Sequence, residues 1–183
     1  MHQEPSAVLE RSSGEPIVND FSIQVATVNG SGSQSANKIL MRTIFQMGVP
    51  VSGKNLFPSN IAGLPTWFTI RANKDGWIAR AEEVDVMVAM NPETALEDMA
   101  KVRAGATVVL NTDLKLDTTR TDITVCRVPF GQIVAGSCPD PKLRKLVTNI
   151  IYVGILAYLL DLEMDEVKGA MTSTSGPGVS LMA

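Results

Sequence analysis

The chain has 183 residues, of which 45% are hydrophobic and 19% are charged, and its formal net charge is −3. This composition predicts one globular domain with tails, and the slightly acidic balance argues against a general nucleic-acid-binding protein. The longest apolar stretch, residues 150–160, is much shorter than the ~20 residues needed to cross a bilayer, so we expect no membrane span. With one histidine and two cysteines, the chain cannot complete a zinc site or a four-thiolate cluster from its own residues, so we expect no metal site.

The N-terminal 20 residues are polar and of mixed charge, with neither the apolar core of a secretory signal nor the arginine-rich composition of a transit peptide. We therefore expect a disordered tail over residues 1–20 and a cytoplasmic protein. Residues 21–74 contain five lysines and arginines and no carboxylate, although the whole chain is acidic. A segment of charge +5 tolerates an anion, but five unrelated surface cations would give the same count.

Periodicity predicts strands alternating with helices in chain order. Residues 21–28 alternate as a strand, a glycine-rich turn follows, and residues 35–47 have an apolar stripe at helical spacing. Later strands are expected at 66–72, 84–90, 107–111 and 122–128, with helices over 92–102, 141–160 and, briefly, 164–169. The turn at residues 73–76 predicts a hairpin that joins strand 66–72 to residues 77–81. The expected fold is therefore α/β: a Rossmann-like, mostly parallel sheet with helices on both faces and one β-hairpin.

The glycine turn after the first strand is the feature with the most chemical content. A glycine turn lets backbone N–H groups approach an anion while the following helix adds its dipole, so phosphate is the natural ligand. The alternative is a tight turn needed only for chain reversal. The candidate anion-binding residues of this turn are Gly30, Ser31, Gly32, Ser33, Gln34 and Ser35.

A nicotinamide enzyme would also need an acidic residue about 20 positions beyond the turn to hold the ribose, and the carboxylate-free segment contains none. Ligands of open α/β sheets lie beyond the carboxyl ends of the strands. The turn, the loop at residues 52–64 and Asn91 after the fourth expected strand should therefore converge on one crevice. Asn91 precedes Pro92 and also fits the simpler role of a helix cap.

Five segments resemble a known family: NGSGSQSAN at 29–37, GKNLFPSN at 53–60, GLPTW at 63–67, VDVMVAMNP at 84–92 and NIIYVG at 149–154. Together they are similar to the gamma-type domain of 2-oxoacid:ferredoxin oxidoreductases, and within that family to the branch that fuses this domain to the front of the alpha subunit of a 2-oxoglutarate oxidoreductase. The resemblance covers about residues 22–169. It implies participation in oxidative decarboxylation of a 2-oxoacid, such as 2-oxoglutarate, to an acyl-coenzyme A.

The resemblance also implies the cofactors and the partners. Thiamine diphosphate, Mg and the iron–sulfur cluster would lie in partner domains or subunits, namely the rest of the alpha subunit and the thiamine-binding beta subunit, with ferredoxin accepting the electrons. This domain would contribute no catalytic residue, would help to bind coenzyme A and would be inactive alone. The expected coenzyme A site is the glycine turn together with Lys54, Ser59, Asn60 and Asn91.

The expected domain organisation is a tail at 1–20, a gamma-type domain at 21–170 and, at 171–183, a fragment that resembles the pyrimidine-binding domain of the alpha subunit. The apolar helix over residues 150–160 leaves hardly any polar face, so we expect a neighbouring subunit to cover part of it. Two other classes of protein remain open on sequence grounds: a free-standing dinucleotide-binding oxidoreductase and a non-catalytic assembly domain. The missing acid opposes the first class.

Overall fold

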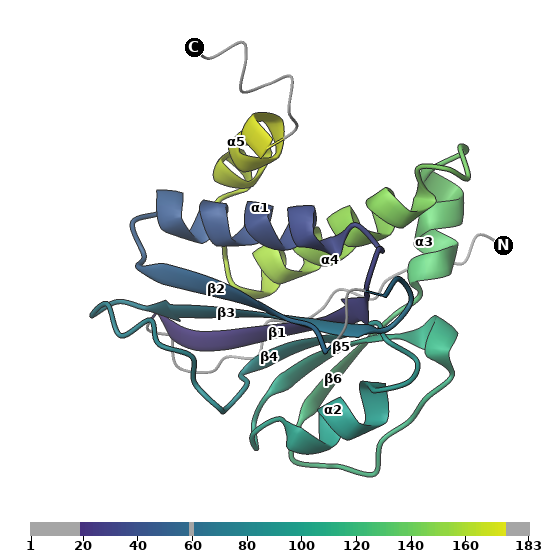
Figure 1. Ribbon diagram of the computed structural model, residues 1–183, viewed down its shortest axis with the longest axis horizontal. Coiled ribbons are helices and arrows are strands. Elements are labelled where there is room, and N and C mark those ends of the chain that lie inside the picture. The colour runs from purple at the N-terminus through teal and green to yellow at the C-terminus, as the bar shows by residue number, and fades with distance from the viewer. Residues whose placement is uncertain (1–18, 59–60, 175–183) are drawn as a thin grey trace, which may run out of the picture.

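The fold is a six-stranded mixed sheet, seen in a computed structural model that describes residues 19–58 and 61–174 (Figure 1). The strands are β1 (Asp20–Val28), β2 (Val51–Leu56), β3 (Pro65–Asn73), β4 (Val86–Ala89), β5 (Thr107–Asn111) and β6 (Thr124–Val128). Their order in space is β2-β3-β1-β4-β5-β6. The strands β1, β4, β5 and β6 are parallel, whereas β3 is antiparallel to both β1 and β2. The carboxyl ends of the four parallel strands therefore share one edge of the sheet.

The helices lie on both faces of the sheet, as the sequence predicts. They are α1 (Ser33–Gln46), α2 (Ala95–Lys101), α3 (Phe130–Ser137), α4 (Arg144–Leu159) and α5 (Met164–Thr174), with a 3-10 turn at Thr112–Leu114. Figure 1 shows α1 and α4 over one face of the sheet, α5 packed on α1, and α2 beneath the opposite face. We call these the α1 face and the α2 face.

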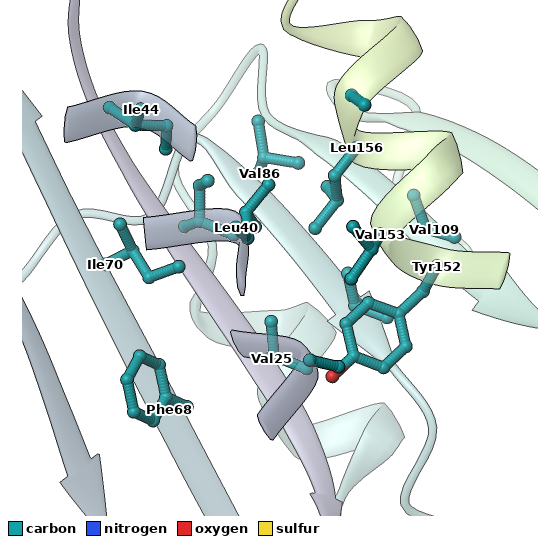
Figure 2. Packing of buried hydrophobic residues seen from close by; sticks show 14 of the residues in the cluster. Val25, Leu40, Ile44, Phe68, Ile70, Val86, Val109, Tyr152, Val153 and Leu156 are labelled. Atoms are coloured by element: carbon teal, nitrogen blue, oxygen red, sulfur yellow. The ribbon is translucent and has the colours of Figure 1, made fainter. Parts of the chain in front are cut away.

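The alternation of side chains along β1 explains this arrangement. Ile23 and Val25 point to the α1 face and are fully buried against residues of α1 and α4, including Leu40 and Leu156 (Figure 2). Ala26 points to the α2 face, where it packs with the buried residues of β4, β5 and α2 in a second core. The two cores share the sheet as their common wall.

The predicted hairpin is wrong in one of its strands. The partner of β3 is β2, which precedes it, and residues 77–81 form no strand. The cause is the Asn73 side chain, whose Oδ1 accepts hydrogen bonds from the N–H groups of Asp75 and Trp77 at 2.9 and 3.0 Å. These bonds complete a local turn, and the chain then leaves the plane of the sheet.

The sequence analysis also missed α3, because its eight residues are too few to show a clear helical periodicity before α4. The helix predicted at 164–169 continues through Thr174. No helix among the described residues is long and apolar enough to span a membrane. One side of α4 packs on the sheet, while Leu143 just before it, Leu146 and Tyr158 are about half exposed. The expected cover from a neighbouring subunit stays a prediction.

Close packing of α1 on the sheet generates a prediction at Gly53. A Cβ atom there would lie 2.7 Å from Met41 Sδ and 2.9 Å from Phe68 Cζ, so Gly53→Ala overpacks the contact between α1 and β2. We expect a loss of about 1–3 kcal/mol in the free energy of unfolding, measured by chemical denaturation. The matched control is Gly154→Ala, since Gly154 is exposed on α4 with open space around it. This control should be neutral or stabilise by up to about 1 kcal/mol, and equal effects of the two substitutions would contradict the prediction.

Candidate functional site

A recess of about 200 Å³ opens where β1 ends and α1 begins. It lies at the shared carboxyl edge of the parallel strands, on the α1 face. Eleven residues line it: Thr27, Val28, Asn29, Gly30, Gly32, Ser33, Gln34, Asn37, Asn55, Thr66 and Phe68. We call this cavity the turn recess. None of its lining residues carries a formal charge, so backbone dipoles and neutral polar side chains determine its electrostatics.

The glycine turn presents the amino end of α1 to the turn recess. Gly30 and Gly32 have φ values of 82° and 80°, in the left-handed region that favours glycine. Gly32 is the N-cap residue of α1, and no side chain caps the helix there. The first N–H groups of a helix have no partner within the helix, so this end is equipped to donate to an anion.

Two side chains of α4 hold the turn in place. Asn149 Nδ2 donates to the carbonyl oxygen of Ser31 at 2.9 Å. The Tyr152 hydroxyl donates to Asn37 Oδ1 at 2.9 Å and lies 3.2 Å from the carbonyl oxygen of Ser33. In Figure 2 the Tyr152 ring lies among the core residues of α4 and the sheet. Residues more than 110 positions away in the chain therefore fix both the turn and the first turn of α1.

The second predicted loop lies beside the turn. Asn29 N–H donates to the carbonyl oxygen of Leu64, Gly63 N–H donates back to Asn29, and Asn29 Nδ2 donates to the carbonyl oxygen of Ile61. The expected convergence of these two loops is therefore observed. Ser59 and Asn60, the predicted binding residues of the second loop, lie outside the described residues.

One hydroxyl of the turn is left without a partner. Ser31 Oγ is buried and makes no hydrogen bond within the part of the chain that the structure describes. A buried, unpaired polar atom costs free energy unless something binds to it. Ser31 does not line the turn recess, so this hydroxyl identifies no contact with a ligand there.

The predicted site residues fall into separate groups. Gly30, Gly32, Ser33 and Gln34 line the turn recess, whereas Ser31 and Ser35 do not. Asn91 lies at the same edge of the sheet but is completely buried. Its Nδ2 donates to the carbonyl oxygen of Thr27 at 3.0 Å and its Oδ1 accepts from the N–H of Glu93 at 2.8 Å. Both ends of this side chain are used structurally, but Asn91 is not the helix cap of the simpler alternative, because α2 begins at Ala95 with Thr94 as its N-cap residue.

The structure places Lys54 away from the turn recess. Lys54 lies opposite Thr69 in the β2–β3 ladder, and its side chain points to the α2 face. The next residue, Asn55, lies opposite Phe68 and lines the turn recess instead. Because successive side chains of a strand point to opposite faces, the two residues cannot share one site. The predicted residue, Lys54, and the residue that lines the turn recess, Asn55, are therefore consecutive in the sequence.

The cations of the positive segment do not gather at the turn. Lys38 and Arg42 are exposed on α1, Arg71 pairs with Asp20, and Lys54 faces the other side of the sheet. Sequence reasoning missed Asn37, Asn55 and Thr66 as polar lining residues. The available signal for Asn37 was an amide side chain beside Ala36 and Leu40 on the buried side of α1. Among residues 19–58 and 61–174, no group of three or more histidine, cysteine or acidic side chains could hold a metal ion.

Comparisons with known proteins agree on the class of fold. Residues 22–180 match the description of the pyruvate ferredoxin/flavodoxin oxidoreductase family. The chain therefore belongs to this family of 2-oxoacid:ferredoxin oxidoreductases, and the resemblance seen in the sequence is confirmed. A search of curated proteins found no match.

Three solved structures share the fold. One is 2-oxoglutarate:ferredoxin oxidoreductase from Magnetococcus marinus with 2-oxoglutarate, coenzyme A and succinyl-CoA bound, at a TM-score of 0.72 and 20% identity over 87% of this chain and 27% of that chain. The second is the gamma subunit of keto/oxoacid ferredoxin oxidoreductase from Geobacter sulfurreducens, at a TM-score of 0.64 and 16% identity over 84% of this chain and 83% of that chain. The third is a subunit of pyruvate oxidoreductase from Thermotoga maritima, at a TM-score of 0.64 and 16% identity over 82% of this chain and 83% of that chain. The chain thus spans about a quarter of the first relative and most of the other two.

The Tyr152 contacts generate a prediction of stability. Burial raises the pKa of the Tyr152 hydroxyl above its ordinary value. A group whose pKa is higher in the folded than in the unfolded state contributes stability below the unfolded pKa, and the contribution is lost as the pH rises above about 10. Tyr152→Phe should cost about 0.5–1.5 kcal/mol of unfolding free energy at neutral pH, because the partners on Asn37 and Ser33 lose their donor.

Denaturation at a series of pH values checks this prediction. The wild-type protein should lose stability above about pH 10, and Tyr152→Phe, which retains only Tyr158 as a tyrosine, should show a shallower loss. An unchanged alkaline slope in the variant would show that Tyr152 is not the group responsible.

Proposed function

We propose that this chain is a component of a thiamine diphosphate-dependent 2-oxoacid:ferredoxin oxidoreductase, in which it binds the phosphates of coenzyme A at the glycine turn and contributes to subunit assembly. The observation that carries the proposal is the uncapped amino end of α1, whose first residues line the turn recess. Such an end favours a ligand that accepts hydrogen bonds. The family to which the chain belongs and the coenzyme A bound in the 2-oxoglutarate enzyme of similar fold support the choice of ligand.

The geometry revises the set of residues in this proposal. Backbone N–H groups between Gly30 and Ser35 donate to the phosphates, and the neutral side chains of Asn37, Asn55 and Thr66 form the polar wall beside them. Lys54 and Asn91 leave the proposed site, for the reasons of strand alternation and internal hydrogen bonding given above. In the revised proposal, fixed backbone dipoles hold the phosphates in place of the mobile positive charge of Lys54.

Thiamine diphosphate, Mg and the iron–sulfur cluster stay assigned to partner domains or subunits. A four-thiolate cluster needs four cysteines, and this chain has two, Cys126 and Cys138. Cys126 lies in β6, where burial raises the pKa of its thiol, so it is a poor thiolate ligand. Decarboxylation of a 2-oxoacid such as 2-oxoglutarate, and transfer of the electrons to ferredoxin, would take place in the assembled cytoplasmic complex.

Substitution at the glycine turn tests the binding site. Gly32→Val forces a β-branched residue to a φ of 80° and should distort the row of N–H groups. We expect coenzyme A affinity, measured by calorimetric titration, to fall by about tenfold or more, equivalent to about 1.4 kcal/mol. Gly48→Val is the matched control, since Gly48 has a φ of 81° at the opposite end of α1 with open space around it. It introduces similar backbone strain away from the recess and should leave the affinity unchanged.

Two neighbouring residues of β2 separate this geometry from the sequence reading. Asn55→Ala should weaken coenzyme A binding by about 0.5–1.5 kcal/mol, the value of one hydrogen bond, whereas Lys54→Ala should leave it within about twofold. The reverse result would restore Lys54 to the site and reject the recess as the phosphate position. Equal losses in Gly32→Val and Gly48→Val would show that strain alone, and no binding contact, is responsible.

The isolated 183-residue chain should show no oxidoreductase turnover and no tight binding of thiamine diphosphate. The measurement is reduction of ferredoxin with 2-oxoglutarate and coenzyme A, with and without added thiamine diphosphate and Mg. Turnover by the pure chain would overturn the assignment of the catalytic cofactors to partners.

A further inference from the structure

A second recess lies on the α2 face of the sheet, at the end away from the glycine turn. Its floor consists of two rows of polar side chains set by the strand register. Ser22, Arg71 and Ser52 lie opposite one another across β1, β3 and β2, and two residues along each strand the second row follows. The second row consists of Gln24, Thr69 and Lys54. The same strands direct apolar residues such as Ile23 and Ile70 to the α1 face.

A segment of chain converts this polar face into a recess. Antiparallel strands often have one solvated face, and polar side chains alone would need no further explanation. Here, however, residues 78–85 cross the face and are fixed at both ends. Ser52 Oγ donates to the carbonyl oxygen of Ile78, the Asp85 N–H donates to the carbonyl oxygen of Ser22, and Asp85 Oδ2 accepts from the Ser22 N–H. The enclosed volume is about 290 Å³, with Arg80, Ala81, Glu82 and Val84 as its wall.

The recess has an excess of unpaired positive charge. Arg71 forms an ion pair with Asp20 and donates to the carbonyl oxygen of Ala72. Lys54 and Arg80 form no ion pair with any described residue, and Asp85, at the end of the wall segment, is paired with Arg103. Glu82 supplies one carboxylate against these two cations. The Ser22 hydroxyl and the Gln24 carboxamide line the same recess and are neutral groups that can donate hydrogen bonds.

We propose that the recess on the α2 face binds a compact multivalent anion, a phosphate or a polycarboxylate, between Lys54 and Arg80. Two unpaired cations on opposite sides of the recess, one on the sheet and one on the wall, can contact one anion at two points. The volume is at the lower limit of small-molecule pockets, which favours a compact ligand over a nucleotide. The site is independent of the turn recess, since it lies on the other face of the sheet and shares no lining residue with it.

Calorimetric titration of the full chain with inorganic pyrophosphate, and separately with citrate, tests the proposal and distinguishes phosphate from carboxylate ligands. At least one of the two anions should bind. The double substitution Lys54→Gln with Arg80→Gln should weaken binding by about tenfold or more, because two charge-assisted contacts are lost. The charge-matched control is Lys38→Gln with Lys74→Gln, which removes two exposed cations of the same segment that do not line the recess. This control should bind as the wild type does.

Three further variants localise the anion. Glu82→Gln should strengthen binding by about twofold or more, since it removes a like charge from the wall, whereas the adjacent Glu83→Gln, which does not line the recess, should have a smaller effect. Gly32→Val should leave binding unchanged, which separates this site from the turn recess. The proposal is overturned if neither anion binds, if both double variants weaken binding equally, or if only Gly32→Val abolishes it. Circular dichroism of each variant confirms that the fold is retained.

Discussion

The hydrogen bonds between α4 and the glycine turn are the constraint on which the geometry of the turn recess depends. The turn uses two left-handed glycines, and glycine loses more conformational freedom on folding than any other residue. Asn149 and Tyr152 offset this cost because they bind carbonyl oxygens on both sides of the N-cap position. Both side chains are buried, so their polar groups depend on these partners as much as the turn depends on them. The packing of α4 and the shape of the turn therefore depend on each other.

The pleat of β2 divides the polar surface of the molecule into two sites. Gly53 faces α1, Lys54 faces the opposite side and Asn55 faces the turn recess, within three consecutive residues. One site is neutral and built from backbone dipoles, while the other is cationic and built from long side chains. A site of fixed dipoles selects a ligand by position, whereas lysine and arginine can adjust to ligands of different shape. The two recesses are therefore suited to different kinds of anion.

The sequence predicted most of the elements because their periodicities are strong. Residues 107–111 were predicted with the observed bounds of β5, and the ends of β1 and α1 differ from the predictions by at most two residues. The errors have two physical causes, one a local contact of a side chain and the other a contact between distant residues. The wrong hairpin strand depends on the Asn73 side chain, and the position of Lys54 depends on the register between β2 and β3. Asn149 and Tyr152 were noticed only as part of a family resemblance, because nothing local in a helix shows that it reaches a turn more than 110 residues earlier.

The comparisons place the same fold in two settings. It makes up most of a gamma subunit in one relative and about a quarter of a longer chain in another. A domain found in both settings must contain its own core, and the two clusters on either side of the sheet meet this requirement. Contacts to the remainder of a complex must then use the surface outside these clusters. Leu146 and Tyr158 of α4 are about half exposed, whereas Asn149 and Tyr152 are buried and hydrogen-bonded to the turn and to α1. One helix can therefore support the turn and contact a partner at the same time, because its two sides are different surfaces.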